Sequence, residues 1–257
     1  MARFSISHQL ATANGIVATV QMTTVSIPGA SSGRTLPADV YVPNGASPRP
    51  LVVVSPGFQL ARTEYASLAH HLATWNFTVV LTDYADQSFS ADHALLAADV
   101  PAVITWALAQ SNLGVDSTKI AVAGHSLGGD ISVYAASLDS RIKAVVGWDP
   151  VDGNPTIVPS KVTGLTAALG VLGETTDSTG SFACAPAANN FTQFYAAAPS
   201  PSIEVTAGTA TDASVHTITK RFDVAWLRRQ LFSDTAMDTW LDHPPELTSG
   251  AVAISRR

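Results

Sequence analysis

The segment Gly124-His125-Ser126-Leu127-Gly128 places a serine between glycines at the end of an apolar run. TKIAVAG leads into it and SLGGDISVYAASL continues from it, so the pattern G-x-S-x-G stands at an expected strand-to-helix turn. Such a turn projects the serine hydroxyl above the edge of a sheet. A glycine-rich turn with a capping serine is the plainer interpretation, since Ser is a favoured N-cap residue. The motif in this context favours Ser126 as a catalytic nucleophile.

A serine hydroxyl is a weak nucleophile and needs a base that an acid orients. Where the serine lies in such a motif, the chain order is Ser, then Asp or Glu, then His. Only His216 and His243 follow Ser126 among the seven histidines. His216 lies in TATDASVHTITK, which we expect to be a loop after the strand PSIEVTAG. His243 lies in LDHPP beyond the last amphipathic helix, where a surface or capping role fits better, so we expect His216 to be the base.

Two aspartates compete for the role of the acid. Asp149 follows the apolar run KAVVGW, and Asp177 follows the next run, TAALGVLG, within GETTDST. Asp152 lies on the same loop as Asp149 but further from the strand end. Asp149 could also serve as a plain turn residue that satisfies backbone amides. The residues alone leave Asp149 and Asp177 open.

The oxyanion of an acyl-transfer reaction needs two backbone donors. The amide of Leu127, at the start of the helix after Ser126, is one candidate. The amide of Phe58, after the flexible Gly57, is the other, and the Phe58 ring would line the acyl pocket; a Pro-Gly turn followed by a core phenylalanine is the alternative. Trp148 is expected either as a flat platform for substrate or as a core residue at the sheet end.

The elements that must position these residues alternate between strand-like and helix-like runs. Alternating or continuous apolar runs predict strands over 16–28, 37–43, 50–57, 77–84, 118–124, 143–150, 166–173 and 201–208. Patterns with a helical period predict helices over 63–75, 92–110, 126–138 and 220–232. The first two strands are expected to form an antiparallel pair. The pattern predicts a single α/β domain over 1–257, with a mostly parallel sheet and helices on both faces.

Composition excludes several classes of function. The net charge is −6 and charged residues make up only 13% of the 257, without a basic cluster, so nucleic-acid binding is not expected. A single cysteine, Cys184, excludes an intrachain disulfide and a cysteine zinc cluster, and no H-E-x-x-H motif occurs. We therefore expect no metal and no cofactor. No apolar stretch is long enough to span a membrane. A monomer is expected.

The localisation of the protein stays open in the sequence. The first residues lack a charged segment followed by an apolar block. A cytoplasmic enzyme and a secreted one without its signal peptide both fit. The low share of charged residues is common in secreted enzymes and favours secretion.

Several segments taken together resemble the chlorophyllase group of α/β-hydrolases, and in layout the lidless bacterial cutinases and polyester hydrolases. They are RTLPADVYVP, SPGFQLARTEYASLAHHLATWNFTVVLTDY, GHSLGG, GWDPVDG, GVLGE and CAPAANNFTQFY, within about 34–216. The chlorophyllase pattern implies Ser126 as nucleophile, Asp149 as acid and His216 as base, whereas the cutinase-like layout implies Asp177 as acid. On this resemblance we expect Asp149 to be the acid, with Asp177 as the alternative. Leu127 stands where plant chlorophyllases carry arginine, which weakens chlorophyll as a substrate.

The resemblance implies a serine carboxylic-ester hydrolase that acts on an ester, small or polymeric. The stretch of 16 residues between Asp149 and TAALGVLG is too short for the helical cap of lipases. We therefore expect an open cleft lined by Phe58, Leu127 and Trp148, which would admit bulky esters and polyesters. Chlorophyllase activity is one alternative. A non-catalytic binding module on the same fold is an alternative from another class.

Overall fold

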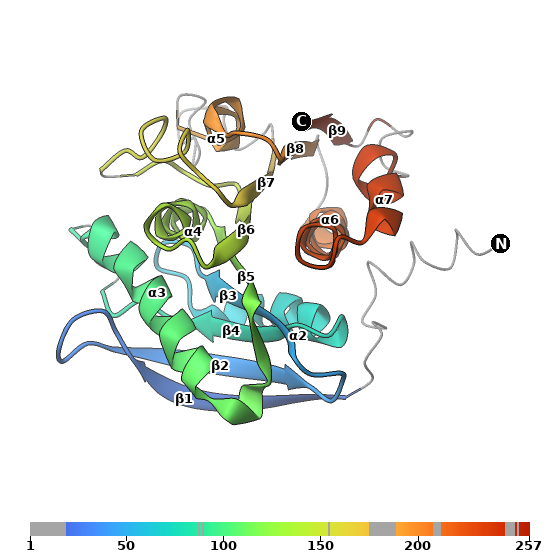
Figure 1. Cartoon of the computed structure of the whole chain (residues 1–257). Helices are drawn as coiled ribbons and strands as arrows, with labels where there is room; N and C mark the ends of the chain where they lie inside the picture. The colour runs from blue at the N-terminus through green and yellow to red at the C-terminus, as the bar shows by residue number, and fades with distance from the viewer. Residues whose placement is uncertain are drawn as a thin grey trace.

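The computed structural model of the chain describes residues 19–86, 88, 90–153, 155–174, 189–207, 212–244, 250 and 252–257, and only the backbone of 212–217. A single sheet of nine strands runs through the molecule in the order β1-β2-β4-β3-β5-β6-β7-β8-β9 (Figure 1). The strands are β1 (Val20–Pro28), β2 (Thr35–Pro43), β3 (Arg49–Ser55), β4 (Thr78–Thr82), β5 (Val115–His125), β6 (Ile142–Trp148), β7 (Ala168–Glu174), β8 (Ser202–Ala207) and β9 (Val252–Arg256).

Six neighbouring strands, from β4 to β8 in the sheet order, are parallel to one another. β1 and β2 pair antiparallel at one edge, as expected, and β2 is antiparallel to β4. At the other edge, β9 pairs antiparallel with β8. The expectation of a mostly parallel sheet is confirmed, and the carboxyl ends of β3, β5, β6 and β7 therefore meet at one edge of the sheet.

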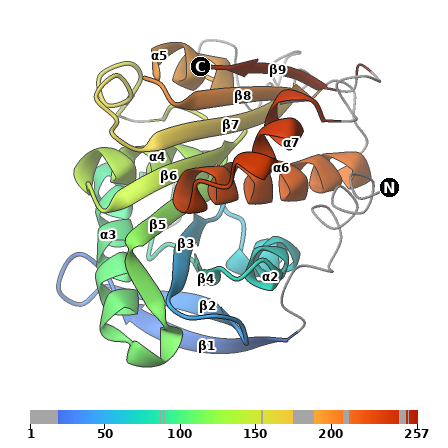
Figure 2. The same ribbon diagram turned by 45° about the vertical axis from the view of Figure 1, so that its right-hand side comes forward.

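Helices cover both faces of this sheet (Figures 1 and 2). α3 (His93–Ala109), α4 (Leu127–Leu138) and α5 (Phe191–Ala197) contribute side chains to one apolar cluster. α2 (Ala66–Thr74), α6 (Asp212–Phe232) and α7 (Asp238–Asp242) contribute to the cluster on the opposite face. Three short 3₁₀ turns, η1 (Arg62–Tyr65), η2 (Ser111–Leu113) and η3 (Thr235–Met237), join these elements.

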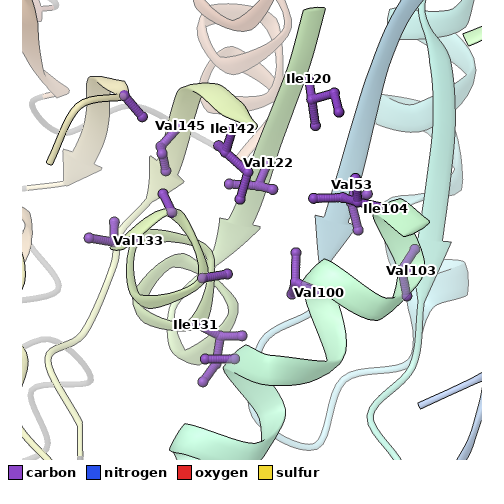
Figure 3. Close-up of a cluster of buried hydrophobic side chains, with 14 of the residues drawn as sticks. Val53, Val100, Val103, Ile104, Ile120, Val122, Ile131, Val133, Ile142 and Val145 are labelled. Atoms are coloured by element: carbon purple, nitrogen blue, oxygen red, sulfur yellow. The ribbon is translucent and has the colours of Figure 1, made fainter. Parts of the chain in front are cut away.

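The central strands are apolar at every position because both of their faces are buried. In β5, Ile120 and Val122 pack on the side of α3 and α4, whereas Ala121 and Ala123 pack on the side of α2 and α6. Figure 3 shows the first of these layers, in which side chains of α3 and α4 meet those of β3, β5 and β6. The small alanines let α6 approach the other face closely. This double packing holds the end of β5 rigidly.

The prediction of a loop around His216 is wrong, because the backbone there is helical. α6 begins at Asp212, so His216 lies in the first turns of a helix. Ile218 and Phe222, four residues apart, are buried in the same cluster as Trp226. The apolar stripe of α6 thus starts earlier than the sequence pattern indicated, and this packing extends the helix toward its N-terminus.

Three further elements lie outside the expected set: α5, α7 and β9. All three are short, with seven, five and five residues. The connection from β6 to β7 contains no helix in its described residues, 149–153 and 155–167. No helix among the described residues is long and apolar enough to cross a membrane.

Candidate active site

Ser126 occupies a strained turn between β5 and α4. Its backbone has φ 51° and ψ −115°, a conformation that residues with a side chain rarely adopt. The turn is fixed from several sides, since the Ser126 amide donates to the Trp148 carbonyl at 2.8 Å and the Ser126 carbonyl accepts from the amides of Gly129 and Asp130. This is the geometry that a nucleophile held at the head of a helix requires.

The glycines of the motif are required by sterics. A Cβ added at Gly124 would lie 2.1 Å from the carbonyl oxygen of Gly128. A Cβ added at Gly128 would lie 2.2 Å from the carbonyl oxygen of Ser55, in the neighbouring strand β3. Both contacts involve backbone atoms, which cannot move aside without shifting β3 or α4. Only glycine therefore allows α4 to start this close to the sheet.

Two tyrosine hydroxyls hold the Pro56–Gly57 peptide, which directly precedes Phe58. Tyr84 donates to the carbonyl of Pro56 at 2.9 Å, and the amide of Gly57 donates to the hydroxyl of Tyr65 at 3.0 Å. Because these two groups are the ends of one peptide unit, its plane is fixed on both sides. Burial raises the pKa of both tyrosines, and well above the ordinary value for Tyr84, so both stay neutral hydroxyls at physiological pH.

The hydroxyl of Tyr65 also links this loop to the nucleophile turn. It lies 2.8 Å from Nδ1 of His125, the residue before Ser126. The Tyr65 ring stacks on Trp148, with 6.4 Å between ring centroids and 16° between planes. The ends of β3, β5 and β6 are thus connected through one side chain from η1.

Ser126 lies in a pocket of about 260 Å³, which we call the Ser126 pocket. Two other residues predicted for the site, Phe58 and Leu127, line it as well. Leu127 is the first residue of α4, so its amide lacks an acceptor within the helix. The remaining lining residues are Ser88, Ala91, His93, Val151 and Gly153.

Asp149 lines a second pocket, of about 400 Å³, together with His125 and Trp148. Because His125 and Ser126 are sequence neighbours that line different pockets, the nucleophile turn lies between the two. Asp149 has φ 41°, a second strained residue at a strand end. Its Oδ1 accepts from the amide of Glu174 at 2.9 Å, and its own amide donates to the Leu172 carbonyl at 2.7 Å.

Trp148 lines the Asp149 pocket rather than the Ser126 pocket, and its side chain is buried. Its indole Nε1–H donates to Oδ1 of Asp223 at 2.8 Å. Asp223 lies in α6 with no exposed area, and burial raises its pKa well above the ordinary value while the bond from Trp148 opposes this. Most of the Trp148 side chain is therefore packed as a core residue, and a small part of it lines the pocket with Asp149.

The remaining predicted residues fall into three groups. The carboxylate of Asp152 accepts from the amides of Ile157 and Val158, which makes it a structural cap of the loop. His216 is placed by its backbone alone, in α6. Asp177 and Cys184 lie outside the described residues. Within the residues that the structure describes, no cluster of His, Cys, Asp or Glu side chains could hold a metal ion.

Sequence patterns did not reveal the contacts of Tyr65 or the pairing of His93 with Asp130. Tyr65 lies within 63–75, where only a helix was expected, and its hydroxyl joins Gly57 to His125. Asp130 did carry a signal, because a carboxylate in the apolar helix LGGDISVYAASL needs a reason.

Known proteins resemble the chain over most of its length. The family described as "PETase: PET hydrolase-like" matches residues 6–257. The chain belongs to the PET hydrolase-like family. Its relatives include a bis(hydroxyethyl) terephthalate hydrolase of Streptomyces coelicolor, 26% identical over 88% of this chain and 70% of the relative. Cutinase 1 of Thermobifida cellulosilytica is 28% identical over 79% and 76%, and a cutinase of Thermobifida fusca is 28% identical over 79% and 66%.

Family membership confirms the α/β-hydrolase fold and the cutinase-like part of the resemblance. It also makes the chain a carboxylic-ester hydrolase. The relatives named here are cutinases and a terephthalate ester hydrolase, so they do not support the chlorophyllase alternative.

Proposed function

We propose that the protein hydrolyses carboxylic esters, including polyesters, through Ser126, His216 and Asp149. The observation that carries the proposal is the strained turn of Ser126 in a pocket lined by Phe58 and Leu127. Polyesters are proposed because relatives are named as cutinases and a terephthalate ester hydrolase. The connection from β6 to β7, without a helix in its described residues, supports a cleft open to bulky substrates.

In the proposed mechanism, His216 takes the proton from the Ser126 hydroxyl as its oxygen attacks the ester carbonyl. The amides of Phe58 and Leu127 donate to the resulting oxyanion. The tetrahedral intermediate then collapses, and the alcohol leaves with the proton from His216. Water repeats the sequence on the acyl-enzyme, which releases the carboxylic acid and restores Ser126.

The place of α6 supports His216 as the base. Thr219 and Lys220 of α6 line the same pocket as Asp149. Residues three and four apart lie on one face of a helix, so His216 occupies that face one turn earlier. That face borders the pocket lined by His125 and Trp148, the last residues of β5 and β6, which supports His216 as the base.

Two aspartates are candidates for the acid of the proposed triad. Asp149 is favoured by its position, since β6 pairs with β5 so that Trp148 lies opposite His125 and Asp149 follows at the level of Ser126. The cutinase-like layout instead favours Asp177, and membership in the PET hydrolase-like family gives that alternative weight. Asp149→Asn and Asp177→Asn should therefore be compared for turnover. A loss confined to Asp177→Asn would overturn the choice of Asp149.

Ser126→Ala tests the proposal as a whole, with p-nitrophenyl butyrate as substrate. The variant should lose turnover while its circular dichroism and melting temperature stay near wild type. Ser137→Ala, at the far end of the same helix, is the matched control, because its hydroxyl donates to the carbonyl of Tyr134, within the same helix. Retained turnover in Ser126→Ala would refute the proposed nucleophile. A panel of esters from acetate to long-chain acids, with an aromatic polyester film, defines the substrate range.

A further inference from the structure

A second histidine–carboxylate pair lies beside Ser126 and is separate from the proposed triad. His93, the first residue of α3, lines the Ser126 pocket. Asp130, in the first turn of α4, has no exposed area. Nδ1 of His93 lies 3.6 Å from Oδ2 of Asp130. A fully buried carboxylate with so long a contact is costly, which calls for a reason other than stability.

The imidazole of His93 packs against both Asp130 and Gly153. Its Nδ1 is buried against Asp130, and its side chain is 17% exposed. The exposed part of the side chain therefore lies away from Nδ1, and Nε2 is the other polar atom of the ring. Gly153 packs against the ring so closely that an added Cβ would lie 2.4 Å from Cε1 and 2.6 Å from Nδ1. The site has space for this ring only because residue 153 is glycine.

The groups around the pair act on the charge of Asp130. Burial raises the pKa of Asp130 to about 6, with Asp152 adding to this rise and His93 and the Gly153 amide opposing it. The nearby hydroxyl of Tyr84 donates to the carbonyl of Pro56 and stays neutral, because burial raises its pKa. Above about pH 6 the carboxylate of Asp130 is ionised and can accept a hydrogen bond from Nδ1 of His93. A ring that donates through Nδ1 carries its acceptor at Nε2.

We propose that His93 forms a polar subsite of the Ser126 pocket that accepts a hydrogen bond from a hydroxyl group of the substrate. Asp130 acts as a positioning residue, since it holds the ring through Nδ1. Asp130 lies against the ring, and the charge of Asp152 acts on Asp130, so an anionic substrate group is disfavoured. The preferred class is therefore a hydroxyl-bearing ester rather than a carboxylate-bearing one. The inference rests on the proposed role of Ser126 as nucleophile.

The experiment compares matched esters at pH 7.5, namely 2-hydroxyethyl benzoate and 2-methoxyethyl benzoate. The methyl ether lacks the hydroxyl donor but keeps the same ethyl chain and benzoyl group. The ratio of the two kcat/KM values therefore measures the contribution of the hydroxyl group, and general effects on turnover cancel. A neutral hydrogen bond corresponds to a preference of about three- to tenfold for the hydroxyl ester. His93→Phe should bring the ratio to about one.

Three further variants keep the test decisive. His93→Gln retains an acceptor and should keep part of the preference. Asp130→Asn should lower the ratio while the imidazole is still present, and it replaces His93→Phe if that variant does not fold. His70→Phe, an exposed histidine on α2, is the control and should keep the wild-type ratio.

Several outcomes would overturn the subsite. The first is a wild-type kcat/KM ratio of the hydroxyl ester to the methyl ether near one, and the second is a ratio that His93→Phe leaves unchanged. The third is a higher wild-type kcat/KM for the monobenzoate of glycolic acid, which carries a carboxylate, than for 2-hydroxyethyl benzoate. Failure of the proposed function appears separately, as hydrolysis of both esters by Ser126→Ala.

Discussion

Replacing Asp130 by asparagine should stabilise the protein at neutral pH relative to acidic pH. The carboxyl of Asp130 has no exposed area, and burial raises its pKa from 3.8 to about 6, against the opposing contact with His93. A tenfold change in a protonation equilibrium corresponds to about 1.4 kcal/mol. Compared with the unfolded chain, the folded protein therefore favours the neutral carboxyl over the ionised one by about 3 kcal/mol.

The sign of the effect follows from the raised pKa. The stabilisation from the neutral carboxyl is complete below the unfolded pKa near 3.8 and is lost as the pH rises through about 6. Asparagine does not titrate, so the variant gains on the wild type as the pH rises. Between pH 4.5 and pH 7.5, the free energy of unfolding of Asp130→Asn should rise by about 2 kcal/mol relative to that of the wild type. For a domain of this size this corresponds to roughly 4–8 °C in melting temperature.

Urea unfolding of both proteins at several pH values measures this difference. Asp139→Asn is a control of opposite sign. Burial raises the pKa of Asp139, but the hydrogen bonds and charge of Arg141 outweigh this and lower it. Asp139→Asn should therefore fall further behind the wild type as the pH rises through the titration of the carboxyl. A stability difference for Asp130→Asn that does not change with pH would refute the reasoning.

Two further substitutions test the geometry around the nucleophile. Tyr65→Phe removes the hydroxyl that accepts from the amide of Gly57, so kcat for p-nitrophenyl butyrate should fall while KM changes little. The control Tyr134→Phe should leave kcat unchanged. Equal kcat values for the two variants would show that the loop before Phe58 does not need this hydrogen bond. Gly128→Ala places a Cβ 2.2 Å from the backbone of β3 and should lower stability by more than about 3 kcal/mol in urea unfolding. Gly164→Ala meets nothing within 4 Å and should change stability by less than about 0.5 kcal/mol, so similar effects of the two would contradict the steric argument.

Much of the fold could be predicted because its signals are local. The buried strands are continuous apolar runs, and the turn at Ser126 is marked by glycines that sterics require. β9 escaped prediction because it is a five-residue edge strand that is only partly buried. The start of α6 was misjudged because Thr, Asp and Ser before Ile218 resemble a loop, whereas burial of the stripe through Phe222 fixes the helix.

The candidate site could be predicted only where chain order restricts it. Ser126, Phe58 and Leu127 follow strand ends, and the structure brings them to one pocket. The contact of Tyr65 with His125 spans 60 residues of sequence, and no local pattern encodes it. The pair of His93 and Asp130 likewise depends on how α3 and α4 pack together.

The most direct test of the account is the identity of the nucleophilic residue that a serine-directed probe labels. A fluorophosphonate probe should inactivate the enzyme at one equivalent, and peptide mass spectrometry should locate the adduct on Ser126. Inactivation and labelling should proceed at the same rate, and Ser126→Ala should remain unlabelled. An adduct on another residue, or full activity in protein labelled at Ser126, would contradict the account.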